Sequence, residues 1–138
     1  MALFGGAYFC DKRVAFLVPF LALLLSDMIL GLHDTMVYVY AGFALTVMIG
    51  FWLSSRLNAR RIAAAAVGSS VLFFIVTNFG AWLTSGLYPV TIDGLLQAYA
   101  AAIPFFQNSL LSNLVFTALL FGGYAVLQRN VHALAQQP

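Results

Sequence analysis

Few side chains in this sequence can do chemistry, and the sharpest of them is a carboxylate in an apolar run. The 138 residues include four aspartates, two histidines, one cysteine and no glutamate. Asp27 follows a stretch of leucines, where an ionised carboxylate needs a cation, several hydrogen-bond donors or a wet cavity. Three interpretations of Asp27 stay open: a structural hydrogen bond, contact with a ligand, and coupling to a proton.

His33 and Asp34 bring a base and an acid together in one short turn. They could contribute to a binding site at that turn. The alternative is a solvated turn in which Asp34 caps the next helix, since aspartate is a favoured N-cap residue.

Amides and aromatic rings form the remaining candidates. Asn78 lies in an apolar run, where an amide either bonds across helices or contacts a flat polar ligand. Trp82 and Tyr88 are residue types that anchor helices at the membrane interface. Asn113 should face a neighbouring helix or a cavity rather than lipid. The candidate ligand-binding residues are therefore Asp27, His33, Asp34, Asn78, Trp82, Tyr88, Asn108 and Asn113.

The composition dictates the kind of element that holds these residues. The chain is 63% hydrophobic and 7% charged, against roughly 45–50% and about 25% in soluble domains. This composition excludes a soluble globular enzyme, and it excludes disorder. Helices are required, because unpaired backbone groups are too costly in lipid. We expect an all-α integral membrane protein, a single transmembrane domain over residues 1–138, with full spans at 14–32, 36–53, 62–82 and 110–127.

The basic residues predict the orientation of these four spans. All six lie at positions 12–13, 56–61 and 129, whereas segments 31–35 and 84–108 contain none. The positive-inside rule makes the basic side and the C-terminus cytoplasmic. The candidate ligand-binding residues then gather toward the outer half. This asymmetry favours a receptor that opens to the outside and argues against a pore, because a pore needs polar groups along its full depth.

Two shorter segments and one packing motif complete the expected architecture. Residues 1–10 form an apolar stub, either the end of a preceding helix or a segment lying at the interface. Residues 92–102 predict a short outer interfacial helix, capped by Thr91, with Asp93 in its first turn and Pro104 near its end. That helix is either a lid over the bundle or a connector on headgroups. Ala64 and Gly68 have small-xxx-small spacing, which lets another helix approach from within the bundle or from a partner.

Three segments, LLLSDMILG, TNFGAWL and AAIPFFQNSLLSNL, carry a resemblance that covers nearly the whole chain. The sequence resembles a family of uncharacterised bacterial membrane proteins described as candidate transport proteins, related to the S components of energy-coupling factor (ECF) transporters. The resemblance implies six helices in the bacterial plasma (inner) membrane. The four spans would match helices three to six, and residues 2–9 the end of helix two. This chain would then be N-terminally shortened, lacking helix one and most of helix two.

The resemblance also implies partners: the lipid bilayer, a vitamin-like small-molecule solute, and a membrane coupling subunit with separate ATPases. We therefore expect a solute-binding transport component with an outward-facing polar pocket. The alternative is a small membrane scaffold or assembly subunit with no ligand of its own. No catalytic residue, metal, cofactor or nucleic-acid partner is expected. Asp27, His33 and Asp34 lack a nucleophile or metal site, and no Gly-rich phosphate motif is present.

Overall fold

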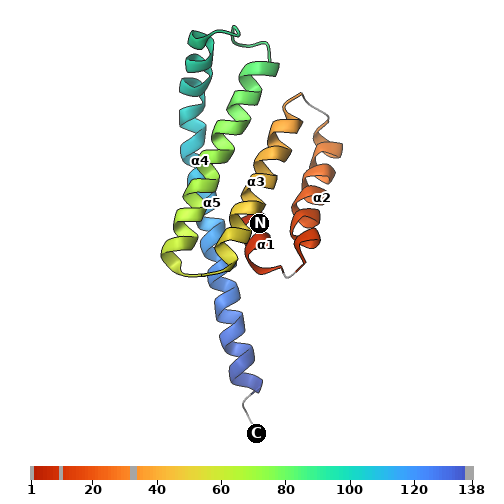
Figure 1. Cartoon of the computed structure of the whole chain (residues 1–138), viewed down its shortest axis with the longest axis vertical. Helices are drawn as coiled ribbons and strands as arrows, with labels where there is room; N and C mark the ends of the chain where they lie inside the picture. Colours follow the sequence, from red (N-terminus) through yellow and green to blue (C-terminus); the bar gives the residue numbers. More distant parts are fainter. Residues whose placement is uncertain (1, 10, 32–33, 136–138) are drawn as a thin grey trace.

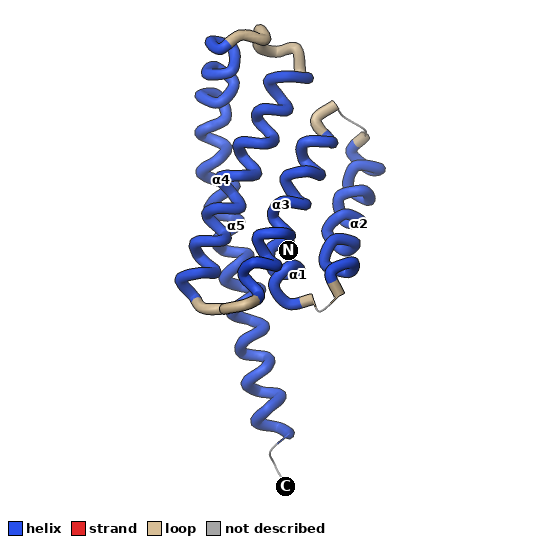
Figure 2. Tube along the Cα trace, in the orientation of Figure 1, coloured by secondary structure: helices blue, strands red, loops and turns tan. Residues whose placement is uncertain are grey.

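The computed structural model describes residues 2–9, 11–31 and 34–135, without the side chains of Leu30 and residues 132–135. Within these residues every regular element is a helix (Figure 2). The five helices are α1 (Ala2–Tyr8), α2 (Lys12–Leu30), α3 (Met36–Ser54), α4 (Ala59–Thr84) and α5 (Ile92–Ala135). The expected all-α fold is confirmed, and the predicted bounds of the first three spans agree with α2, α3 and α4 to within a few residues.

The long helices alternate in direction (Figure 1). α2 and α4 run upward in that view, and α3 and α5 run downward. The short α1 lies in the lower half, and it leads into the start of α2. The turn between α3 and α4 is at the lower end, whereas the connection from α4 to α5 is at the upper end. α5 alone continues well below the others.

Side-chain caps explain where several helices begin. Asp11 accepts the N–H of Arg13 at 2.8 Å at the start of α2, and Asn58 accepts the N–H of Arg61 at 2.8 Å at the start of α4. Each bond satisfies one of the N–H groups that the first turn leaves free. The Thr91 hydroxyl likewise accepts an N–H of the first turn of α5 at 3.2 Å, which confirms the predicted cap.

The expected cap of α3 by Asp34 is wrong. Thr35 occupies the N-cap position of α3, and it makes no side-chain capping bond. Its backbone is already helical there, with φ −82° and ψ −3°, whereas a capping side chain needs an extended backbone at that residue. Asp34 is an exposed turn residue one position earlier.

The apolar stub is the most deeply buried element of the fold. Five of the seven residues of α1 are buried, so the helix packs inside the bundle and does not lie along an interface. It crosses α3 at two glycines: a Cβ added at Gly6 would lie 2.9 Å from the Gly50 Cα, and one added at Gly50 would lie 2.6 Å from the Leu3 carbonyl oxygen. The two backbones are therefore in direct contact, which only glycine permits.

The expected separation of an interfacial helix from the last span is wrong. Residues 92–102 are the first part of α5, which continues without a break to Ala135 and contains Pro104. Proline removes one backbone N–H but leaves the hydrogen bonds on either side, and membrane helices tolerate this. The 44 residues of α5 correspond to about 66 Å at about 1.5 Å per residue.

Three helices in the described part of the chain are long and apolar enough to cross a membrane: Met36–Ser54, Ala59–Thr84 and Ile92–Val131. α2 is not among them, and it holds Lys12, Arg13 and Asp27 within 19 residues, so four full spans stay a prediction. Large apolar side chains face outward, such as Leu25 at 60% and Met28 at 73% exposure. An apolar exterior on apolar helices points to a protein surrounded by lipid.

Candidate functional site

A cavity of about 470 Å³ lies among α1, α3, α4 and α5. Its size falls within the range of about 300–1,000 Å³ that is typical of small-molecule sites. Most of its wall comes from α4 and α5, with α3 and the first residues of α1 completing it. The lining residues are Ala2, Leu3, Phe43, Thr46, Ser69, Ser70, Phe73, Phe74, Thr77, Asn78, Ala102, Phe105, Phe106, Ser109 and Asn113.

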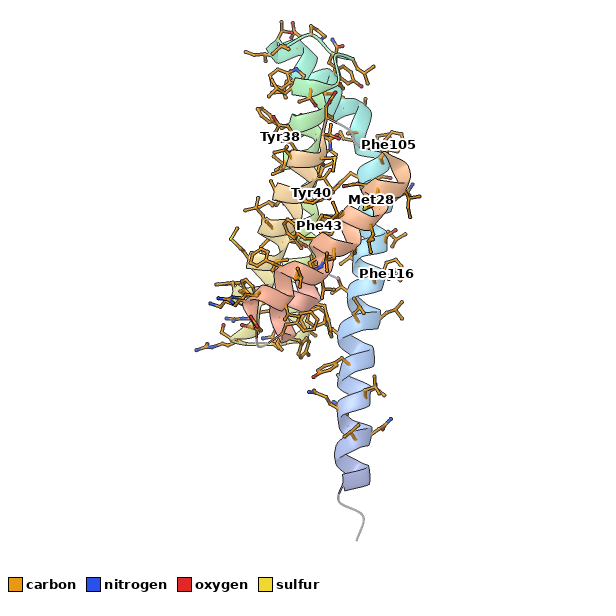
Figure 3. The ribbon with its side chains drawn as sticks, turned by 90° about the vertical axis from the view of Figure 1, so that its right-hand side faces the viewer. Met28, Tyr38, Tyr40, Phe43, Phe105 and Phe116 are labelled. Atoms are coloured by element: carbon orange, nitrogen blue, oxygen red, sulfur yellow. The ribbon has the colours of Figure 1, made fainter. Side chains whose placement is uncertain are left out.

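Aromatic rings form the apolar part of this wall. Phe74 on α4 and Phe106 on α5 lie 4.6 Å apart between ring centroids, with their planes tilted by 45°. Phe43 on α3 packs edge-on against Phe73 at 5.5 Å. Figure 3 shows Phe43 on α3 and Phe105 on α5, which also line the cavity. Rings from three helices therefore offer flat surfaces on which a planar molecule can stack.

A polar network ties the lower part of the cavity together. The Asn113 amide on α5 donates to the Ala66 carbonyl at 3.0 Å and to the Ser70 hydroxyl at 2.7 Å, both on α4. The expected role of Asn113 in facing a neighbouring helix or cavity is confirmed, and both apply. Its expected place in the outer half is wrong, because Ala66 and Ser70 lie in the basic-end half of α4. The cause is the length of α5, which starts 21 residues before Asn113.

The upper part of the cavity holds hydroxyl and amide groups that bond to their own helices. Thr77 donates to the Phe73 carbonyl at 2.8 Å, and Asn78 donates to the Phe74 carbonyl at 2.8 Å. The interpretation that Asn78 bonds across helices is therefore wrong. Asn78 lines the cavity, so the alternative interpretation, contact with a ligand, stays a prediction. On α3, Thr46 donates to the Gly42 carbonyl at 2.9 Å.

Asp27 is placed away from the cavity. Its side chain is buried at 6% exposure, and its Oδ2 accepts the Tyr40 hydroxyl of α3 at 2.9 Å. This bond joins α2 to α3 and agrees with the structural interpretation of Asp27. The edge-on packing of Phe20 on the Tyr40 ring, 5.5 Å between centroids, supports the same contact.

The other candidates that the structure describes also lie outside the cavity. Trp82 donates its indole N–H to the Pro89 carbonyl at 3.0 Å, which fastens the connection between α4 and α5. Tyr88 lies in that connection and is half-buried, whereas Asp34 and Asn108 are exposed. His33 lies outside the described residues. Of the eight predicted ligand-binding residues, the structure brings Asn78 and Asn113 together at one cavity.

The expected packing of Ala64 and Gly68 within the bundle is wrong. Both residues are exposed, and a Cβ added at Gly68 would meet nothing within 4 Å. The neighbouring small residues face inward instead: Ala65 is 5% exposed and Ser69 is 2% exposed. The buried small-xxx-small register is therefore one residue later, and contact of Ala64 and Gly68 with a partner stays a prediction.

All six basic residues lie toward one end of the bundle. Lys12 and Arg13 begin α2, Arg56 follows α3, and two more arginines open α4, while Arg129 is on the part of α5 that extends beyond the same end. Figure 3 shows nitrogen-tipped side chains gathered near the turn between α3 and α4. The predicted grouping of the basic residues at one end of the helices is therefore confirmed.

The wall of the cavity is neutral and partly aromatic. None of its lining residues is charged, and in the described ranges no three His, Cys, Asp or Glu side chains lie close enough to hold a metal ion. The hydroxyls and the phenylalanines of the wall are not among the candidate ligand-binding residues predicted from the sequence. One signal was available: adjacent Phe73-Phe74 and Phe105-Phe106 lie a turn from polar residues on two helices that the charge pattern makes antiparallel.

Residues 1–134 match the model of a family described as a family of unknown function, DUF6580. No curated protein matches the chain, and no solved structure matches it.

Proposed function

The chain belongs to the DUF6580 family, and we propose that this member binds an uncharged small solute as a component of a membrane transport system. The observation that carries the proposal is the cavity of about 470 Å³ between the helices, whose wall combines aromatic rings with amides and hydroxyls. Polar side chains inside an apolar bundle are costly, so their gathering at one cavity favours a binding role.

The proposed topology has four crossings, with the basic end in the cytoplasm of a bacterial cell. α2 would be the fourth span, since its outer face is apolar from Leu17 to Ile29 and its two cations stand at the boundary. The C-terminal part of α5 would then extend into the cytoplasm. The ECF S-component relationship is part of the same proposal. In such a system a membrane coupling subunit and separate ATPases would supply the energy for transport. A vitamin-like solute is the matching ligand class.

The experiment is a thermal-stability screen of the purified full chain in detergent against a broad panel of vitamins and metabolites. A ligand of the cavity should raise the melting temperature, because binding to the folded state alone stabilises it. Asn78→Leu should remove that rise, because the amide lines the cavity and bonds only within its own helix. Asn108→Leu is the matched control, since Asn108 is an exposed amide of α5 outside the cavity. A panel without any stabilising solute would overturn the proposal.

A second candidate function, a scaffold or assembly subunit, is favoured by one observation. Several polar groups are already bonded within the chain: Asp27 to Tyr40, Trp82 to Pro89, and Asn113 to α4. A scaffold would use these groups for its own fold alone. It predicts a membrane partner that co-purifies at constant stoichiometry, together with no solute-dependent stabilisation.

A further inference from the structure

Most polar side chains of the cavity already use their hydrogen-bond donors; the exceptions are Ser70 and Ser109, whose hydroxyls donate to no described residue, and one N–H of Asn78. The hydroxyl hydrogens of Thr46, Ser69 and Thr77 are directed to backbone carbonyls at 2.9, 3.0 and 2.8 Å. A hydroxyl has one hydrogen but two lone pairs. Each of these three groups therefore presents an acceptor to anything that enters the cavity.

The two amides have the same bias. Asn113 uses both hydrogens of its Nδ2, on the Ala66 carbonyl and on Ser70, and Asn78 uses one on the Phe74 carbonyl. The assignment of nitrogen and oxygen follows from chemistry, since a backbone carbonyl can only accept. Both amide oxygens remain as acceptors. Of the four N–H groups on these two amides, one N–H of Asn78 stays free to donate.

The acceptors lie at two levels of the cavity, with the aromatic wall between them. Ser69 and Asn113 mark the lower level, and Thr77 and Asn78 the upper one. Asn78 is nine positions after Ser69 on α4, which corresponds to about 14 Å along the helix. Phe73, Phe74 and Phe106 lie between or beside the two levels, so a ligand reaching both would lie against rings.

From this pattern we infer that the solute of this cavity is an uncharged planar ring system that donates hydrogen bonds from N–H or O–H groups on its edge. The inference rests on the proposed binding function and names its ligand class. Charge is excluded by a wall with no ionised partner, because an unpaired ion in such a site is strongly disfavoured. A ligand with acceptors alone would have only the Ser70 and Ser109 hydroxyl hydrogens and one N–H of Asn78 to bond to, and it would leave the more numerous acceptors of the wall unpaired.

Two isomeric probes test the donor requirement at constant size and composition. 6,7-Dimethylquinazoline-2,4-dione keeps two ring N–H donors, and 1,3-dimethylquinazoline-2,4-dione replaces both with N-methyl groups. The first should raise the melting temperature of the full chain, and the second should bind at least about tenfold more weakly. Equal binding of the two isomers, or tighter binding of the N-methyl isomer, overturns the inference.

A matched pair of threonine variants places the probe at the cavity. Thr77 and Thr84 both donate to the carbonyl four residues earlier on α4 at 2.8 Å, but only Thr77 lines the cavity. Thr77→Val should weaken binding of the N–H probe about fivefold, and Thr84→Val should leave it unchanged. Thr46→Val repeats the test on α3 if Thr77→Val does not fold. Equal affinities in the cavity variant and the Thr84→Val control would overturn the placement.

The outcomes also separate this inference from the function on which it rests. If neither isomer binds while charged or acceptor-only solutes of the wider panel stabilise the protein, the donor class is wrong and solute binding stands. If only detergent or lipid occupies the cavity and no solute of any class stabilises the chain, the proposed function itself fails.

Discussion

Asn113 is the residue whose burial has the clearest physical reason. Its two hydrogen bonds, to the Ala66 carbonyl and to Ser70, satisfy both amide hydrogens across the interface of α4 and α5. In lipid, such bonds are among the few directional contacts that hold helices together, because tails and leucines are equally apolar. Asn113 therefore contributes to both the fold and the cavity, whereas Asn78 contributes to the cavity alone.

Replacing Asn113 with leucine should destabilise the folded bundle by about 1–2 kcal/mol, because two interhelical bonds are lost at similar side-chain volume. The measurement is unfolding of the detergent-solubilised protein by added SDS, monitored by tryptophan fluorescence. Asn108→Leu serves as the control, and its exposed side chain should make that change neutral. Equal stability of the Asn113→Leu and wild-type proteins would contradict the network.

Asp27 and Tyr40 should behave as a coupled pair with a structural role. In a double-mutant cycle of Asp27→Leu and Tyr40→Phe, each of which removes one partner, we expect a coupling free energy of about 0.5–1.5 kcal/mol from their single hydrogen bond. Neither change should alter solute-dependent stabilisation, because neither residue lines the cavity. Loss of that stabilisation in a folded Asp27→Leu protein would return Asp27 to the list of ligand contacts.

At the scale of the element, glycine positions decide how closely the helices approach. Gly6 and Gly50 bring α1 and α3 into backbone contact, whereas Gly68 has open space around it. Glycine has no side chain and weakens a helix interior, so a glycine kept at a crossing implies a packing reason. The spacing of small residues in the sequence pointed to Ala64 and Gly68, and the structure uses the neighbouring face.

Gly50→Ala should cost about 1–3 kcal/mol of folding free energy, because the new methyl group would press on the backbone of α1 and force the helices apart. Gly68→Ala is the matched control in α4, and it should be neutral or stabilising by up to about 1 kcal/mol through helix propensity. Both variants can be compared by thermal unfolding followed with circular dichroism. A Gly50→Ala protein as stable as Gly68→Ala would show that α1 does not cross α3 as described.

Much of the element structure could be predicted from the sequence, and the exceptions have physical causes. Apolar length and backbone satisfaction in lipid place α2, α3 and α4, and Thr91 marks the start of α5. Pro104 was expected to end a helix by the rules of soluble proteins, but a membrane helix continues through it. The burial of α1 and the aromatic wall of the cavity depend on which faces meet, and one helical period alone does not specify that.

At the scale of the whole molecule, the basic residues and the polar residues of the cavity occupy different positions. The cations share one end, whereas the cavity spans the middle of the bundle, from Thr77 and Asn78 in the upper half of α4 to Ser69, Ser70 and Asn113 toward the basic end. The sequence interpretation placed the polar candidates at the outer rim. Helix α5 accounts for the difference, because its early start carries Asn113 past the middle of α4.

The proposed orientation predicts opposite accessibility of the two ends in cells. In a Cys10→Ser background, Leu87→Cys in the upper connection should react with a membrane-impermeant maleimide in intact cells. Leu57→Cys in the lower turn should react only after permeabilisation, because the positive-inside rule places that turn in the cytoplasm. Both side chains are exposed. Labelling of the two positions from the same side would overturn the four-span arrangement.

The occupancy of the cavity is the central claim, and filling the cavity tests it most directly. Ala102 lines the cavity, whereas the adjacent Ala101 is exposed outside it. With the solute that most stabilises the wild-type protein, Ala102→Phe should abolish the rise in melting temperature while the ligand-free protein stays as stable as before. Ala101→Phe should retain the full rise. An unchanged rise in folded Ala102→Phe protein would contradict the cavity as the binding site.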